Sequence, residues 1–186
     1  MTQAYTVIGG GVMGLCVATE LMGRGADVCV VDHALQPGPH ACSWWAGGML
    51  APFCESETAA EPVVRLGQEA AAWWQAHGVA VTRQGSLVLA LGRDQGDLDR
   101  FARRTEHHTP LDRAGIDHLE PDLDGRFTRG LYFETEAHLS PRAALGELRT
   151  RLHAGGVGFD TALPLSLIHI SEPTRLLSIS YAVFCL

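Results

Sequence analysis

Three glycines near the N-terminus have the spacing that binds a phosphate-containing ligand. Gly9, Gly11 and Gly14 form a G-x-G-x-x-G pattern. In this pattern the first glycine permits a tight turn, the second lets the backbone approach a pyrophosphate, and the third lets a helix pack closely on a strand. The N–H groups of Val12 and Met13 would face the phosphates from a helix N-terminus, whose dipole favours an anion. The pattern therefore predicts nucleotide binding without a cationic side chain.

An acidic residue stands where such a site would meet a ribose. Asp32 lies 18 positions beyond Gly14, where a carboxylate accepts hydrogen bonds from a ribose diol and disfavours a 2′-phosphate. A plain tight turn is the alternative interpretation of the glycines alone, and the pattern does not separate FAD from NAD.

The elements around these residues read as a βαβ unit. Residues 5–8 are β-rich and end at the glycines, and residues 28–31 form a second apolar run that ends at Asp32. Between them, residues 12–24 carry apolar side chains at helical spacing, and Gly25 is placed to close the helix in a left-handed conformation. We therefore expect two buried parallel strands joined by a helix.

A second glycine-rich segment, residues 42–52, has a composition suited to a flat ring. It reads Cys-Ser-Trp-Trp-Ala-Gly-Gly-Met-Leu-Ala-Pro, and small residues let the backbone lie against a flavin while successive N–H groups donate to it. A Gly-Gly turn beside two packing tryptophans is the alternative, and the residues alone leave both open.

The remaining pattern predicts a second domain entered from the first. A helix over 61–77 is expected to bury Trp73 and Trp74, and a helix starting at Ser140, as N-cap, and Pro141 precedes a returning strand. The other expected elements are strands at 85–90 and 130–133 of a mixed sheet, a helix at 97–104 and a strand at 157–159.

The last 22 residues, 165–186, differ in composition from the rest. The first 164 residues contain two Ile and the last 22 contain three. The segment looks like the in-frame translation of a sequencing-library adapter, and we exclude it from the fold. A genuine amphipathic C-terminal segment is the alternative.

The chain resembles the D-amino-acid-oxidase superfamily of FAD-dependent oxidoreductases, and among them glycine oxidases of thiamine biosynthesis. The resemblance covers nearly all of residues 1–164 and is most specific at residues 7–14, Asp32 and residues 46–52; residues 83–87, 119–121 and 138–142 also match. One departure is Ser140, where relatives often have Asp. The resemblance implies an α/β fold: a Rossmann-like FAD-binding domain (1–60 and 139–164, truncated) with an inserted, incomplete mixed α+β substrate domain (61–138).

The resemblance also implies a site and a reaction. The cofactor-binding residues would be Gly9, Gly11, Val12, Met13 and Gly14 at the pyrophosphate, Asp32 and His33 at the ribose, and Cys42, Ser43, Gly47, Gly48 and Met49 at the flavin. The full-length enzyme would move a hydride from the α-carbon of a small amino acid to the flavin, release an imine and form peroxide. The arginine for the substrate carboxylate would lie in a C-terminal half that is absent. No catalytic residue is assigned, and this chain is expected to be inactive and to fold poorly.

Composition limits the alternatives. A net charge of −7 argues against a nucleic-acid partner. Five cysteines without a CxxC pair indicate a reducing, cytoplasmic location, and neither a secretory signal nor a membrane span is expected. No metal is predicted, because the histidines at 107, 108, 118 and 153 read as solvated surface residues. A homo-oligomer is possible when full length. Three alternative functions remain. The first is a related flavin enzyme that oxidises D-amino acids, sarcosine or, with formation of cyanide, glycine. The others are an NAD-dependent dehydrogenase and a non-catalytic nucleotide-binding module.

Overall fold

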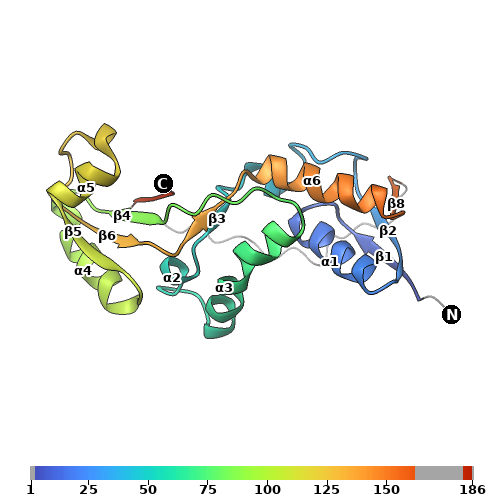
Figure 1. The fold of residues 1–186 in the computed structure, drawn as a ribbon, viewed down its shortest axis with the longest axis horizontal. Helices are drawn as coiled ribbons and strands as arrows, with labels where there is room; N and C mark the ends of the chain where they lie inside the picture. The colour runs from blue at the N-terminus through green and yellow to red at the C-terminus, as the bar shows by residue number, and fades with distance from the viewer. Residues whose placement is uncertain (1–2, 162–181, 186) are drawn as a thin grey trace. The chain divides into compact units, whose positions relative to one another are not determined.

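The computed structural model describes residues 3–161 and 182–185 (Figure 1). These residues form two compact units. The first unit comprises 3–48, 75–80 and 140–161; the second comprises 49–74, 81–139 and 182–185. Apart from residues 182–185, the segment interpreted as adapter-derived lies outside the described residues.

A three-stranded parallel sheet forms the centre of the first unit. Its strands are β1 (Ala4–Ile8), β2 (Asp27–Val31) and β8 (Gly158–Asp160), in the order β1-β2-β8. Val31 pairs with Ile8 on one side and with Asp160 on the other. The predicted βαβ unit and the returning third strand are therefore confirmed. The three strands end at one edge of the sheet, where Asp32 and the glycine turn follow.

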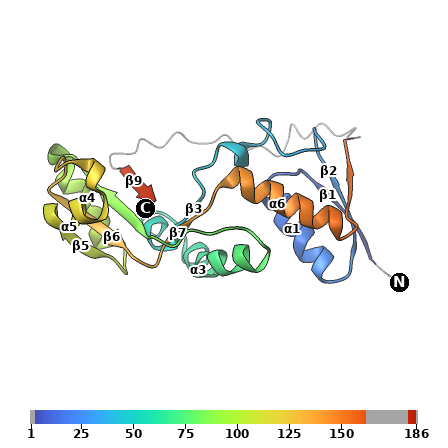
Figure 2. The ribbon, with the colours of Figure 1, turned by 45° about the horizontal axis from the view of Figure 1, so that its top comes forward.

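Two helices pack side by side in this unit. They are α1 (Val12–Gly23) and α6 (Pro141–Ala154), and Figure 2 shows them against each other. Helix α1 lies between β1 and β2 in the chain, and α6 precedes β8, in a sheet of order β1-β2-β8. Because crossovers between parallel strands are right-handed and both step in the same direction, the two helices lie on one face of the sheet. The core between them contains Leu15, Ala18, Ala144, Leu145, Leu148 and Leu152.

The ends of these helices follow the predicted signals in part. Gly25 has φ +77°, and its N–H donates to Met22 O at 2.9 Å while Ala26 N–H donates to Leu21 O at 3.1 Å. The left-handed closure of α1 is thus confirmed. Ser140 is the N-cap of α6 with Pro141 following, as predicted, but the Ser140 side chain accepts no capping hydrogen bond.

The second unit contains a four-stranded sheet in the order β5-β6-β4-β9. The strands are β5 (Thr109–Asp112), β6 (Arg129–Phe133), β4 (Ser86–Leu89) and β9 (Ala182–Cys185). Every neighbouring pair is antiparallel. The expectation of a mixed sheet here was wrong for the part of the chain that the structure describes, because apolar composition identifies strands without giving their direction.

Both faces of this sheet are packed, because the side chains of β4 alternate between them. Val88 belongs to a core with Leu98 and Phe101 of α4 (Gln95–Arg104), together with Phe133. Leu87 and Leu89 pack on the other face against Ile116 of α5 (Arg113–Leu119). Figure 1 shows α4 and α5 on either side of the strands.

Short elements complete the second unit. β3 (Met49–Leu50) pairs antiparallel with β7 (Ala137–His138), α2 (Pro52–Glu55) follows β3, and α3 (Glu61–Ala76) follows α2. Trp74 of α3 is buried as predicted, but Trp73 is only half-buried. The 3₁₀ turns η2 (Gly92–Asp94) and η3 (Pro121–Leu123) also belong to the second unit, whereas η1 (Cys42–Trp45) belongs to the first. No helix among the described residues is long and apolar enough to cross a membrane.

Candidate nucleotide-binding site

The turn between β1 and α1 needs glycine for two different reasons, a positive φ at Gly9 and a lack of room at Gly14. Gly9 has φ +104°, a conformation that side chains disfavour, and its N–H donates to Val31 O at 2.8 Å. A Cβ on Gly14 would overlap the carbonyl oxygen of Gly9 and lie 3.4 Å from Val7 Cγ1. The close passage of helix over strand therefore requires a glycine at position 14.

The N-terminus of α1 presents a backbone donor to a side-chain oxygen. Gly11 is the N-cap, and the N–H of Val12 donates to Ser43 Oγ at 3.0 Å. A Cβ on Gly11 would lie 3.3 Å from the same hydroxyl. The first turn carries no acidic residue, and the Met13 side chain is 74% exposed. The positive end of the helix dipole is therefore not neutralised by a carboxylate, and it can attract an anion.

The carboxylate of Asp32 lies at the edge of the sheet beside this turn. Its Oδ1 accepts the N–H of His33 at 2.7 Å, and its backbone N–H donates to Asp160 O at 3.0 Å. His40 Nε2 lies 3.4 Å from Oδ2. A Cβ on Gly10 would lie only 2.7 Å from that same oxygen. Asp32 is therefore fixed at the end of β2, with its side chain 16% exposed.

A small hollow beside Asp32 extends past the end of the sheet. Arg149 of α6 forms part of its wall: its guanidinium lies 3.7 Å from the centre of the Phe159 ring, and its Nε donates to Gln36 Oε1 at 3.2 Å. Burial lowers the pKa of Arg149, but a guanidinium stays charged at neutral pH. The other lining residues are Gly10, Leu15, Val30, Asp32, Ala34, Leu35, Pro37 and Asp160. In open α/β sheets, ligands bind outside the carboxyl ends of the strands, which is where this hollow lies.

The segment predicted to meet a flavin begins in the first unit. Cys42 is an exposed free thiol, and Ser43 reaches the α1 N-terminus as described. Gly47 has open space around a built Cβ, and Gly48 has φ +77°. Met49 begins the second unit and pairs with His138 across β3 and β7.

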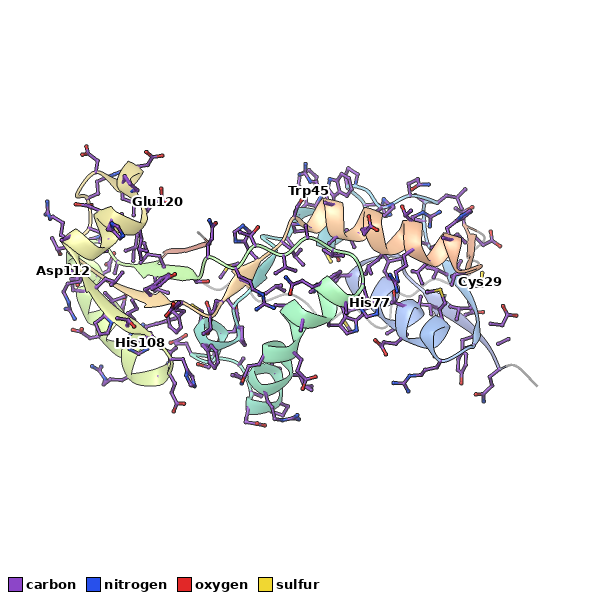
Figure 3. All side chains as sticks on the ribbon, viewed as in Figure 1. Cys29, Trp45, His77, His108, Asp112 and Glu120 are labelled. Carbon is purple, nitrogen blue, oxygen red and sulfur yellow. The ribbon has the colours of Figure 1, made fainter. Side chains whose placement is uncertain are left out.

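The two tryptophans in this segment are fixed to α6. The Arg142 guanidinium lies 5.1 Å from the centre of the Trp44 ring and 5.3 Å from that of Trp45, and Arg142 Nε donates to Trp44 O at 3.3 Å. Figure 3 shows Trp45 beside the start of α6. The Trp45 Nε1–H donates to Pro39 O at 3.0 Å. These contacts hold η1 and the chain before it in place.

The structure thus brings together the glycine turn, the α1 N-terminus, Asp32 and Ser43 within the first unit. Two residues of this group were not predicted from the sequence. Gly10 occupies a variable position of the glycine pattern, and only its approach to Asp32 shows that a side chain does not fit there. His40 lies in a loop without regular periodicity, so no local signal pointed to its contact with Asp32.

A parallel βαβ unit with this turn and a carboxylate after the second strand defines a dinucleotide-binding protein. Residues 4–162 match the FAD dependent oxidoreductase family (DAO), and the chain belongs to that family, whose cofactor is FAD.

Named relatives agree with this assignment. The chain is 51% identical over 160 residues to ThiO of Rhizobium etli, which is named a thiamine biosynthesis oxidoreductase. The match covers 82% of this chain and 49% of that protein. It therefore spans about half the length of this relative. A 58-residue stretch, 31% of this chain and 8% of the relative, is 47% identical to the bifunctional protein ThiO/ThiG of a Nostoc species.

Solved structures share the fold. Glycine oxidase from Bacillus cereus matches with a TM-score of 0.67 at 20% identity, over 87% of this chain and 47% of that one. Iminodiacetate oxidase from a Chelativorans species matches with a TM-score of 0.69 at 20% identity, over 86% and 46%. L-α-Glycerophosphate oxidase from Mycoplasma pneumoniae, solved with FAD bound, matches with a TM-score of 0.67 at 19% identity, over 86% and 44%.

Proposed function

We propose that the protein is the FAD-binding half of an amino-acid oxidase that oxidises glycine or another small amino acid to its imine, with reduction of molecular oxygen to hydrogen peroxide. For glycine, hydrolysis of the imine would give glyoxylate. The observation that carries this proposal is the 51% identity to ThiO across 82% of the chain. The name of that relative, and the fold shared with a glycine oxidase, support a role in thiamine biosynthesis.

The described residues fit the ADP half of FAD. Backbone N–H groups of Val12 and Met13 would hold the pyrophosphate, with Gly9, Gly11 and Gly14 shaping the turn. The Ser43 hydroxyl, which accepts the Val12 N–H at 3.0 Å, would give way to a phosphate oxygen. Asp32, which follows β2 and has a side chain 16% exposed, would accept hydrogen bonds from the ribose hydroxyls, with His33 beside it. A Cβ on Gly10 would lie 2.7 Å from Asp32 Oδ2 and would displace that carboxylate, and a Cβ on Gly14 would overlap the Gly9 carbonyl and reshape the turn, so both glycines support the site.

The flavin half would lie along Cys42, Ser43, Gly47, Gly48 and Met49. When bound, FAD supplies a two-electron acceptor for the hydride of the substrate α-carbon. The chain's own part is to bind and orient the cofactor through backbone N–H groups, and we assign no catalytic side chain to it. We propose that the first unit is the FAD-binding domain and the second unit part of the substrate domain.

The activity is proposed for a longer polypeptide, because the chain spans about half of the Rhizobium relative. A cation for the substrate carboxylate would come from the other half, and this 186-residue chain would not turn over alone. A cytoplasmic location is supported by the free thiols of Cys16, Cys29 and Cys42. A homo-oligomer is proposed for the longer polypeptide only.

Oxidation of a D-amino acid or sarcosine, by an oxidase or a dehydrogenase, is the alternative within the same class. The fold is shared with an L-proline dehydrogenase of P. horikoshii at a TM-score of 0.65, so the acceptor, oxygen or another molecule, must be measured. A non-catalytic nucleotide-binding module is the alternative of another class.

The test is to purify the 186-residue chain and measure FAD binding by flavin fluorescence. Binding is expected to weaken about tenfold or more in Asp32→Ala, because ribose hydroxyls would lose a charged acceptor. Asp27→Asn is the matched control, since it removes an exposed carboxylate from the other end of β2 and should bind FAD as the parent does. No peroxide is expected with glycine, sarcosine or D-alanine.

Two results would contradict the proposal in different ways. If neither FAD nor ADP binds to the folded chain, the cofactor assignment fails. If FAD binds stoichiometrically and peroxide forms from glycine, the assignment stands but the inactivity of this half does not.

A further inference from the structure

The loop that follows β2 is held at three points, which fixes a histidine against Asp32. Gln36 accepts the Nε–H of Arg149 at 3.2 Å, and the Pro39 carbonyl accepts the Nε1–H of Trp45 at 3.0 Å. The Ala41 N–H donates to Gly38 O at 3.0 Å and closes a turn. Because residues 37 and 39 are both prolines, the loop backbone has little freedom between these points.

The turn directs the His40 ring toward the Asp32 carboxylate. His40 Nε2 lies 3.4 Å from Asp32 Oδ2, and the opposite nitrogen, Nδ1, would lie 3.3 Å from a Cβ on Gly38. A side chain at position 38 would therefore push the ring. Gly38 is buried, whereas the His40 side chain is 27% exposed, so the imidazole lies at the surface beside the turn and the carboxylate.

The distance between His40 and Asp32 suits a positioning role. A full N–H···O hydrogen bond is about 2.7–3.2 Å long, so at 3.4 Å the imidazole limits rotation of the carboxylate while Oδ2 keeps lone pairs for a ligand. Oδ1 is already held by the His33 N–H at 2.7 Å. Oδ1 is thus held before a ligand arrives, and the neighbouring His40 ring limits the directions in which Oδ2 can turn.

We propose that His40 is a positioning residue for nucleotide binding, which acts through Asp32 to hold its carboxylate in the orientation that accepts ribose hydroxyls. The inference rests on the proposed function. It adds a residue outside the glycine pattern and outside the segment 42–49, and it makes the loop of residues 36–41 part of the ribose site. Arg149 and Trp45 hold this loop in place, so they would act on the ligand only indirectly, through the position of His40.

The experiment compares two probes on the full 186-residue chain: ADP, which contains the ribose, and inorganic pyrophosphate, which does not. In His40→Ala the dissociation constant for ADP should rise about twofold to threefold, the lower end of the range for one hydrogen bond, because the contact with Asp32 is 3.4 Å long. The constant for pyrophosphate should not change. A general loss of folding would weaken both ligands, so the ratio separates positioning from stability.

Two further variants test whether His40 acts through Asp32. His40→Gln, which keeps a side-chain N–H donor, should recover most of the ADP affinity. In an Asp32→Asn background, His40→Ala should have little further effect, because the partner of the imidazole is already altered. His153→Ala is the matched control, since His153 is an exposed histidine of the same unit on α6; its ADP affinity should equal that of the parent.

The outcomes separate this inference from the proposed function. If the parent chain binds ADP no more tightly than pyrophosphate, the ribose site itself is wrong, and the proposed function fails with it. If the parent prefers ADP but His40→Ala leaves both constants unchanged, or weakens both equally, only the role of His40 is wrong.

Discussion

The two units of this protein depend on their residues in opposite ways. In the first unit the site depends on side chains being absent, because a Cβ at Gly10 or Gly14 would collide with Asp32 or with the backbone of Gly9. In the second unit the fold depends on large side chains being present, and Phe101 and Phe133, both 1% exposed or less, meet edge to face at 6.2 Å. The glycine turn of the candidate nucleotide site is therefore formed by backbone atoms, whereas the second unit is held together by packed side chains.

Charge is also treated differently in the two units. Asp32 is partly exposed and keeps an oxygen available beside His40. In the second unit Glu136 is 1% exposed, and its Oε1 accepts the Cys54 N–H at 2.8 Å. A buried carboxylate that accepts a backbone N–H fixes local structure. Asp32 is therefore open to solvent, whereas Glu136 joins the bend after β6 to α2 through Oε1 and leaves its buried Oε2 without a hydrogen-bond partner among the described residues.

The largest effect is expected from truncating the core of the second unit. Phe133→Ala should lower the free energy of unfolding by about 3–5 kcal/mol, because it removes a fully buried ring and leaves a cavity. Urea unfolding followed by circular dichroism measures it. Tyr132→Phe is the neighbouring control: it removes only the hydroxyl that donates to Gln84 O at 3.0 Å in an exposed hydrogen bond. If Phe133→Ala also abolishes ADP binding under folding conditions, the two units do not behave separately.

Substitution of Gly14 should lower the free energy of unfolding less than Phe133→Ala does. It should, however, have the largest effect of all on ADP binding. Gly14→Ala should destabilise the first unit by about 1–3 kcal/mol, because the methyl group forces the helix away from the strand. ADP binding should be lost, as measured by titration calorimetry.

The control for this substitution is Gly146→Ala in the interior of α6. A Cβ there meets nothing within 4 Å, so alanine should stabilise the helix by about 0.5–1 kcal/mol through its higher helix propensity. If Gly14→Ala binds ADP like the parent, the close approach of α1 to β1 is not needed for the site.

The difference between the units also explains what the sequence could predict. The glycine pattern, the parallel strands, the closure of α1 at Gly25 and the start of α6 at Ser140 are local signals, and the structure has them. β5 was missed because Pro110 interrupts it; a proline is tolerated there since β5 lies at the edge of its sheet. The short helix α5 was missed although Asp112 caps it, its Oδ1 accepting the Gly115 N–H at 2.9 Å.

The candidate site was less predictable where it depends on contacts between distant segments. No periodicity reveals that a Cβ on Gly10 would lie 2.7 Å from the Asp32 carboxylate, or that His40 Nε2 lies 3.4 Å from it. Arg142 illustrates the same limit: it lies 98 residues from Trp44, whose carbonyl it contacts. Glycine patterns record backbone geometry that is local in sequence, whereas side-chain packing around a loop is decided by the whole fold.

The smallest effect on stability is expected at the contact between Arg142 and the two tryptophans, where a side chain packs on the segment that precedes Gly47 and Gly48. Arg142→Lys keeps the charge but loses the Nε–H that donates to Trp44 O and the flat stacking of a guanidinium. Because Arg142 is exposed, the free energy of unfolding should fall by no more than about 1 kcal/mol. The tryptophan emission should shift, since Trp44 and Trp45 lose the same neighbour.

FAD binding distinguishes a merely structural contact from one that orders the flavin segment. If Arg142 holds η1 in place, Arg142→Lys should weaken FAD more than ADP, because in the proposed site only FAD would extend past Ser43 toward Gly47 and Gly48. Arg151→Lys, at the exposed last turn of the same helix, is the matched control and should change neither constant. Equal weakening of FAD and ADP would place the effect of Arg142 on the first unit as a whole, and the segment 42–48 would then owe its order to its own glycines and tryptophans.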